Sequence, residues 1–170
     1  MNIKTLSMTI AAGSLFATGA MADYTGLSYE AVDNGDGTWS ARIFGNFTEA
    51  TDELDAVFGD GVNSLNITST AGFYQNEFGS ATVEGQNPIF IDLFPSLALD
   101  SYVTIGLTTN VGNAMLDIGI DFTDFEAGGD IVTSNGTWFA TPDDAQVLAG
   151  ADLKNCSNYP GLRRPEHRQE

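Results

Sequence analysis

Cysteine and histidine are nearly absent: the 170-residue chain has one of each. A single cysteine, Cys156, cannot form an internal disulfide, and His167 lies close to the end of the sequence. The rest of the chain therefore lacks the residues for a His/Cys metal cluster. It also lacks those for Ser-His-Asp or Cys-His nucleophilic catalysis.

Positive charge is also scarce. The chain has 6 Lys and Arg residues against 23 Asp and Glu residues, which gives a formal net charge of -17. Nucleic-acid binding needs clustered cations that displace counterions from phosphates, so this composition argues against it. Between residues 23 and 153 the one cationic side chain is Arg42. We expect most carboxylates to form a solvated anionic surface.

Long apolar runs are missing after residue 22, and no stretch approaches the roughly 18 apolar residues of a membrane-spanning helix. Residues 1–22 are predicted to be a signal peptide. Lys4 precedes an apolar, small-residue stretch, and Ala20-Met21-Ala22 fits the small-x-small cleavage pattern. The alternative is a buried N-terminal helix. Cleavage after Ala22 predicts a secreted or cell-surface protein with no transmembrane segment in the mature chain.

Alternating side chains and turn residues predict strands along most of the mature chain. The clearest case is a hairpin of residues 24–32 and 38–47, joined by Asp33-Asn34-Gly35-Asp36-Gly37. Asn-Gly and Asp-Gly pairs tolerate the positive φ angles that tight hairpin turns require. In the second arm, Trp39, Ala41, Ile43 and Gly45 are expected on one apolar face.

The remaining strands predict an all-β fold. We expect an antiparallel β-sandwich over residues 23–153, with jelly-roll-like and immunoglobulin-like topologies both open. Expected strands cover residues 54–58, 65–69, 102–107 and 115–122, with a second hairpin of residues 131–133 and 137–140. Residues 89–94 lie between Pro88 and Pro95 and are expected to form an edge strand or a packed loop.

Residues 154–170 differ from the body in composition. They contain four of the six cations, the Cys, the His and two of the five prolines, and they show neither strand nor helix periodicity. We expect a basic tail without regular structure, or an aberrant end produced by truncated or out-of-frame coding. The alternative is a basic tether for an acidic polymer or for the chain's own acidic face.

Several stretches suggest a family pattern when taken together: residues 33–39, 54–60, 72–76, 94–106 and 136–146. They resemble a group of uncharacterised exported proteins of planctomycete-like and other marine bacteria. Such proteins often carry a dockerin-like segment or a PEP-CTERM-type sorting tail. The resemblance covers about residues 24–152 and implies export. It implies no activity and no catalytic residue.

Carboxylates are the most abundant side chains in the chain that could bind a metal ion or take part in catalysis. Hard oxygen ligands suit Ca²⁺, and the candidates for a structural Ca²⁺ site are Asp121, Asp124, Glu126, Asp143 and Asp144. No EF-hand order of ligands is present. A carboxylate-based glycan hydrolase would need two acids about 5–10 Å apart. In a strand, Asp117 and Asp121 would be about 13 Å apart, which is too wide.

Aromatic residues suggest a binding surface. Phe73, Tyr74, Phe78 and Trp138 are candidates for a sugar-binding platform, although tryptophans of β-proteins usually lie in the core. We expect a non-enzymatic exported protein with a structural or adhesive role. Its partner would be an extracellular polysaccharide or a surface protein, and the oligomeric state stays open. The alternatives are a carbohydrate-binding module and a glycan hydrolase.

Overall fold

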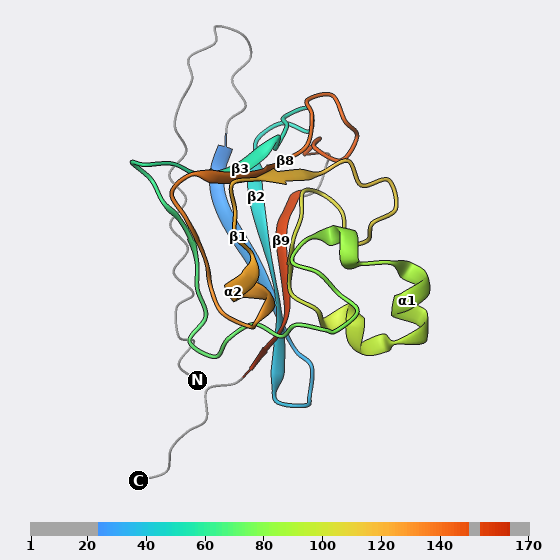
Figure 1. The fold of residues 1–170 in the computed structure, drawn as a ribbon. Coiled ribbons are helices and arrows are strands. Elements are labelled where there is room, and N and C mark those ends of the chain that lie inside the picture. Colours follow the sequence, from blue (N-terminus) through green and yellow to red (C-terminus); the bar gives the residue numbers. More distant parts are fainter. Residues whose placement is uncertain (1–23, 150–153, 164–170) are drawn as a thin grey trace, which may run out of the picture.

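The computed structural model describes residues 24–149 and the backbone of residues 154–163 (Figure 1). The expected signal peptide, residues 1–22, lies outside the described residues. The strands are β1 (Tyr24–Asp33), β2 (Thr38–Phe47), β3 (Ala56–Gly59), β4 (Leu65–Ile67), β5 (Tyr102–Val103), β6 (Leu116–Ile118), β7 (Ile131–Thr133), β8 (Gly136–Phe139) and β9 (Lys154–Arg163). The helices are η1 (Val83–Gly85), α1 (Pro88–Leu93), η2 (Pro95–Leu99) and α2 (Thr123–Glu126), where η marks a 3₁₀ helix.

The strands form three sheets with the orders β1-β2-β9-β5, β3-β8-β6 and β4-β7. All pairings between these strands are antiparallel. The prediction of an all-β fold with antiparallel sheets is therefore confirmed. In the part of the chain that the structure describes, no helix has the length and apolar character needed to cross a membrane.

The first predicted hairpin is confirmed. β1 pairs with β2 from Tyr24 opposite Phe47 to Asp33 opposite Trp39. The turn between them contains Gly35 and Gly37, with φ angles of 81° and 91°. Glycine adopts such positive angles without steric cost, which is why the turn forms at this point of the sequence.

The second predicted hairpin is wrong in its pairing. β7 and β8 lie where strands were expected, but β7 pairs with β4, and β8 pairs with β3 and β6. Residues 56–67 therefore run antiparallel to residues 131–139, interrupted by the loop at residues 60–64. The turn residues Ser134 and Asn135 fit a corner between two sheets as well as a hairpin, and burial of both apolar segments selects the corner.

Residues 89–94 were expected as an edge strand or a loop, and this prediction is also wrong. Pro88–Leu93 form helix α1, because the side chain of Asn87 accepts a hydrogen bond from the amide of Ile89 at 2.9 Å. Pro88 occupies the first helical position, where its missing N–H costs nothing. The segments predicted at 102–107 and 115–122 are strands only at Tyr102–Val103 and Leu116–Ile118.

The expectation of no regular structure after residue 153 is corrected for Lys154–Arg163. These residues form β9, which pairs with β2 on one side and with β5 on the other. Backbone pairing does not need an alternating sequence. The register against β2 shifts between Trp39 and Ala41, opposite Pro160, which has no N–H to donate. Residues 164–170 lie outside the described residues.

The core gathers side chains from the sheets and from the long segment between β4 and β7. Trp138, Phe125 and Val103 are at most 1% exposed, and Phe73 packs on Phe125 with ring centroids 5.1 Å apart. β2 contributes Ile43, which is buried together with Ala41 and Gly45 on the face predicted for them. Burial of these apolar side chains is the main favourable contribution to folding.

Gly59 lies at the corner where β3 ends, shortly before β4 begins to pair with β7 at Leu65. A Cβ atom at Gly59 would overlap the carbonyl oxygen of Thr133 and lie 2.6 Å from the amide nitrogen of Leu65. We expect Gly59→Ala to lower the free energy of unfolding by about 1–3 kcal/mol, since the clash is with backbone atoms. Urea unfolding measures this change.

Gly61→Ala is the matched control, because a Cβ atom at Gly61 meets no atom within 4 Å. It should change the free energy of unfolding by less than about 0.5 kcal/mol. Equal effects of the two substitutions would contradict the close approach of the strands at Gly59.

Candidate functional site

The four aromatic residues predicted as a binding platform do not share a surface. Phe73 and Trp138 are 6% and 1% exposed and belong to the core. Tyr74 is half-buried, and its hydroxyl accepts a hydrogen bond from Asn76 Nδ2 at 3.2 Å. Phe78 alone is exposed. The structure therefore keeps one of the four as a surface candidate and places two in the interior.

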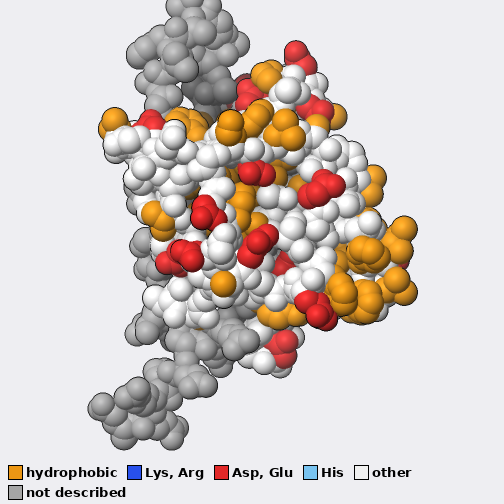
Figure 2. Space-filling model, viewed as in Figure 1, with side chains coloured by type: hydrophobic (Ala, Val, Ile, Leu, Met, Phe, Trp, Pro, Cys, Tyr) orange, Lys and Arg blue, Asp and Glu red, His pale blue; other side chains and the backbone are white. Residues whose placement is uncertain are grey.

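Phe78 belongs to a different surface, which we call the apolar knob. Its members are Phe78, Ile89, Phe90, Leu93 and Phe94, with exposed fractions between 40% and 67%. Phe78 stacks on Phe94 with ring centroids 4.3 Å apart and an interplanar angle of 21°. Figure 2 shows the resulting patch of hydrophobic side chains on the side of the molecule where α1 protrudes in Figure 1.

Helix α1 presents most of its apolar residues to solvent. It has six residues, and none of them is buried. Phe94 closes the helix, with its amide donating to the carbonyl of Phe90 at 2.7 Å, and Pro95 then begins η2. The Asn-Pro start and the Pro stop are sequence signals for a short helix, and sequence reasoning missed them by interpreting the prolines as breaks in a strand.

A buried carboxylate lies at the base of this region. Asp100 is 0% exposed. Its Oδ1 accepts from the amide of Asn76 at 2.8 Å, and its Oδ2 accepts from Nε2 of the buried Gln86 at 3.1 Å. Burial raises the pKa of Asp100 to about 6, and these hydrogen bonds act in the opposite direction.

Asn76 connects Asp100 to both parts of the knob. Its Oδ1 accepts from the amide of Phe78 at 3.0 Å, and its Nδ2 donates to Ser96 Oγ at 3.0 Å. Ser96 lies two residues after Phe94 in the chain. The side chain of Asn76 therefore ties together the two segments that carry the stacked rings, while its own amide is held by Asp100.

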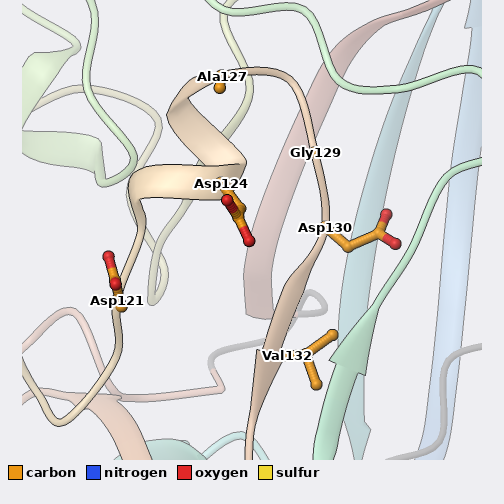
Figure 3. Close-up of a pocket in the computed structure, with 6 residues that line it drawn as sticks. All are labelled: Asp121, Asp124, Ala127, Gly129, Asp130 and Val132. Carbon is orange, nitrogen blue, oxygen red and sulfur yellow. The ribbon is translucent and has the colours of Figure 1, made fainter.

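Two of the predicted Ca²⁺ ligands line a shallow hollow of about 550 Å³, together with Asp130 (Figure 3). Asp121 Oδ1 accepts from the amide of Thr123 at 3.0 Å, and hydrogen bonds to Thr123 lower the pKa of Asp121. Asp130 Oδ1 accepts from the amide of Ser69 at 3.0 Å. Figure 3 shows that the carboxylate of Asp130 points away from that of Asp124.

The other three predicted ligands lie elsewhere. Glu126 Oε1 accepts from the amide of Ala81 at 3.3 Å, and Asp144 Oδ1 accepts from the amide of Gln146 at 2.9 Å. The amide of Asp143 donates to Glu53 at 3.4 Å. Among the described residues, no three His, Cys, Asp or Glu side chains are grouped closely enough to hold a metal ion. The structure thus does not assemble the five predicted Ca²⁺ ligands at one position.

Two further acidic residues, Glu53 and Asp55, lie near Asp143. The pKa of Asp55 is raised, first by burial and then by the nearby carboxylates of Glu53 and Asp143. Burial and like charge both favour the protonated form of a carboxyl group. Among the described residues, Asp55 Oδ1 has no hydrogen-bond partner.

Comparison with known proteins gives no assignment: no family model matches the chain, and neither a curated protein nor a solved structure matches it. The functional argument therefore depends on the geometry of the apolar knob and the residues beneath it.

The connecting role of Asn76 can be measured. Asn76→Ala removes the hydrogen bonds of its side chain to Tyr74, Phe78 and Ser96. We expect the free energy of unfolding to fall by about 1–2 kcal/mol, since three hydrogen bonds are lost. Urea unfolding provides the measurement.

Asn66→Ala is the control, because the Asn66 side chain makes one exposed bond, to the carbonyl of Ser64. This substitution should cost less than Asn76→Ala. A loss for Asn76→Ala no larger than that for Asn66→Ala would show that Asn76 does not hold the two segments together.

Proposed function

We propose that the protein is a non-enzymatic, exported binding protein with a structural or adhesive role, and that it attaches to its partner through the apolar knob. The observation that carries this proposal is the exposure of five large apolar side chains in one cluster, with Ile89 67% and Leu93 65% exposed. Contiguous apolar patches on soluble proteins commonly mark interaction sites.

The surroundings of the knob support a binding role. The face of the described residues seen in Figure 2 carries several carboxylates and no Lys or Arg. Mutual repulsion keeps such a chain dispersed, so an exposed apolar cluster is less prone to unspecific aggregation here than on a neutral surface. A short helix that presents Ile, Leu and Phe residues is suited to an apolar partner surface.

The scaffold is proposed to be a β-sandwich, in which the three antiparallel sheets cover a common core. Export is supported by the sequence of residues 1–22 and by the resemblance to exported proteins of marine bacteria. A secreted or cell-surface location agrees with a chain that has one cysteine and an anionic surface.

A carbohydrate-binding role is the second candidate, and it depends on the exposed stacked rings of Phe78 and Phe94. Sugars stack on aromatic faces but also require polar groups nearby to bind their hydroxyls. The aliphatic neighbours Ile89 and Leu93 fit an apolar partner better. The burial of Phe73 and Trp138 removes half of the original platform.

Export predicts a defined mature N-terminus. When the full chain is expressed in a bacterium with a general secretion pathway, the secreted product should begin at Asp23. Intact-mass spectrometry of the secreted protein tests this directly. Replacing Ala20 and Ala22 by bulky residues should block cleavage. A product that retains residues 1–22 in the unaltered chain would contradict the proposed leader.

Attachment through the knob predicts a loss of surface retention. In the double variant Phe90→Ser with Leu93→Ser, the fraction of protein bound to the outer surface or matrix of the producing cells should fall at least about fivefold. Quantitative immunoblotting of washed cells and medium measures this fraction. Folding should be unaffected, because neither residue is buried.

Val111→Ser is the control, because Val111 is 67% exposed, as Ile89 is, and does not belong to the knob. It should be retained like the wild type. Equal retention of all three proteins would remove the knob as the attachment site. Equal retention together with binding to purified polysaccharides would favour the carbohydrate-binding candidate.

A further inference from the structure

The sheet β3-β8-β6 is largely apolar on both of its faces. Its inner face contributes Val57 and Trp138 to the core, where these side chains are 5% and 1% exposed. Antiparallel sheets that cover a core normally carry polar side chains on the opposite face, which meets water. The residues that alternate with Val57 and Trp138 are mostly apolar instead, so this second face has the composition of a buried surface.

The strand register shows which residues share this second face, which we call the outer face. Its members form two rows that cross the three strands: Ala56, Phe139 and Leu116 in the first row, and Phe58, Thr137 and Ile118 in the second. Figure 2 shows hydrophobic side chains, with carboxylates beside them, at the end of the molecule where β3 and β8 lie in Figure 1.

The outer face is accessible in the folded chain. Leu116, Ile118 and Phe58 are 62%, 65% and 37% exposed, and the core cluster of the described residues does not include them. Thr137 is the polar member of the face, and its hydroxyl donates to the carbonyl of Val57 at 2.9 Å. This hydroxyl is therefore bonded within the sheet, and the outer face offers a partner chiefly apolar contact.

Carboxylates lie at both ends of the outer face. β3 and β6 are both antiparallel to β8, so they run in the same direction and end on the same side of the sheet. Asp60 follows β3 on that side, and Asp121 comes shortly after β6. On the other side, Asp143 comes after β8 and Glu53 before β3, and the amide of Asp143 donates to Glu53 at 3.4 Å.

Hydrogen bonds fix two of these acids beside the sheet. Asp60 Oδ1 accepts from the amide of Asn63 at 2.6 Å, and Asp121 Oδ1 accepts from the amide of Thr123 at 3.0 Å. The segments that form the sheet and its ends, residues 53–60, 116–121 and 136–143, contain no Lys or Arg. A partner of the outer face therefore meets an apolar centre between two negative ends.

The width of the outer face suits one helix. Neighbouring strands lie about 4.8 Å apart, so three strands span about 10 Å, which is close to the diameter of an α-helix with its side chains. A helix laid on a sheet is one of the stable ways to bury an apolar sheet face. A helix with one apolar side and basic residues elsewhere would match both the centre of the outer face and its ends.

We propose that the outer face of the sheet β3-β8-β6 binds a basic amphipathic helix of a partner protein. Apolar residues of that helix cover Phe58, Leu116 and Ile118, and its Lys or Arg residues pair with the carboxylates at the two ends. The site lies on other elements than the apolar knob and does not depend on the proposed function. A second copy of the chain fits less well, because it would bring like charges together.

A synthetic amphipathic helix of Leu and Lys, about 14 residues long, tests the site. Isothermal titration calorimetry with the full-length protein measures its Kd. We expect Leu116→Thr combined with Ile118→Thr to weaken binding at least about tenfold, because apolar contact is lost while the net charge stays the same. Threonine is well suited to strands, and both positions are exposed, so the fold should be retained.

Val111→Thr is the matched control, because Val111 is 67% exposed and lies outside the outer face. This variant and the knob variant Phe90→Ser with Leu93→Ser should bind the peptide like the wild type. Unchanged affinity of the Leu116 and Ile118 double variant would overturn the proposal, since attraction between charges alone would explain binding. Loss of binding in the knob variant would place the peptide on the knob and also overturn it.

The charged ends are tested by Asp60→Asn combined with Asp121→Asn. Asparagine keeps an oxygen that accepts the turn hydrogen bonds, so the change removes charge and preserves the turns. Binding of the Leu and Lys peptide should weaken about threefold or more. The control is Asp33→Asn with Asp36→Asn, which removes as many charges from the turn between β1 and β2. Equal weakening by the two pairs would contradict a basic helix held at the ends of the outer face.

Two measurements do not depend on variants that fold. Amide NMR shifts of the wild type should change with the peptide at residues 56–58, 116–118 and 137–139, and changes confined to residues 88–94 would overturn the site. A peptide of the same pattern with Glu in place of Lys should bind much more weakly, and equal binding of both peptides would contradict the basic character of the partner.

Sedimentation of the protein alone examines the other occupant. A dimer that the Leu116 and Ile118 double variant disperses would show that a second copy covers the outer face, and it would overturn the proposal. These outcomes are separate from the proposed function, which is tested by the surface retention of the Phe90 and Leu93 double variant. Retention can therefore fail while the peptide still binds the outer face, and the reverse can also occur.

Discussion

The antiparallel pairing of residues 56–67 with residues 131–139 fixes the arrangement of the whole molecule. β3 pairs with β8 and β4 pairs with β7, so two segments far apart in the sequence must meet before either is stable. Residues 68–130 then form one long connection between β4 and β7, and its two ends lie side by side. Closing such a loop is entropically unfavourable, and burial of Val57, Leu65, Ile131 and Trp138 along the pairing offsets that cost.

Within this connection little of the chain is stabilised by strand pairing. Of its residues, Tyr102–Val103 and Leu116–Ile118 are the strands, and the rest folds into short helices and turns. Hydrogen bonds of buried polar side chains help to fix these short helices and turns. Gln146 Nε2 donates to the carbonyl of Ile105, its Oε1 accepts from the amide of Ala114, and Asp100 gathers donors from several loops. A buried polar group that is fully bonded favours one arrangement, because any other leaves it unsatisfied.

Local patterns in the sequence predicted local structure well. The Asn-Gly and Asp-Gly turn with alternating residues on its second arm identified β1 and β2, and the alternation of Leu65 and Ile67 identified β4. Partners beyond the next turn could not be predicted in this way. The Ser134-Asn135-Gly136 sequence fits a hairpin and a corner equally, and only the burial of distant strands decides between them. Pairing of β9 is likewise set by its neighbours, β2 and β5.

In the candidate site, too, some features could be predicted from the local sequence and others could not. Exposure of Phe78 agrees with its selection as a binding residue. Phe73 and Trp138 were chosen by residue type alone, and residue type does not distinguish a core ring from a surface ring. Nothing in the sequence distinguishes Asp100 from the many other acidic residues. Its special environment comes from Asn76, Gly79 and Gln86, which lie 14 or more positions away in the chain.

Much of the acidic composition has a local structural explanation. Asp33, Asp36, Asp60, Asp121 and Asp144 each accept a hydrogen bond from the amide two residues later, as in Asx-turns. The pKa values of Asp36, Asp60 and Asp121 are lowered, chiefly by the hydroxyl of Thr38, the amide of Asn63 and the hydroxyl of Thr123, respectively. Asp100 differs from them because its contacts are non-local and its carboxylate is buried. Exposed turns thus contain acids of lowered pKa, whereas burial raises the pKa of Asp100.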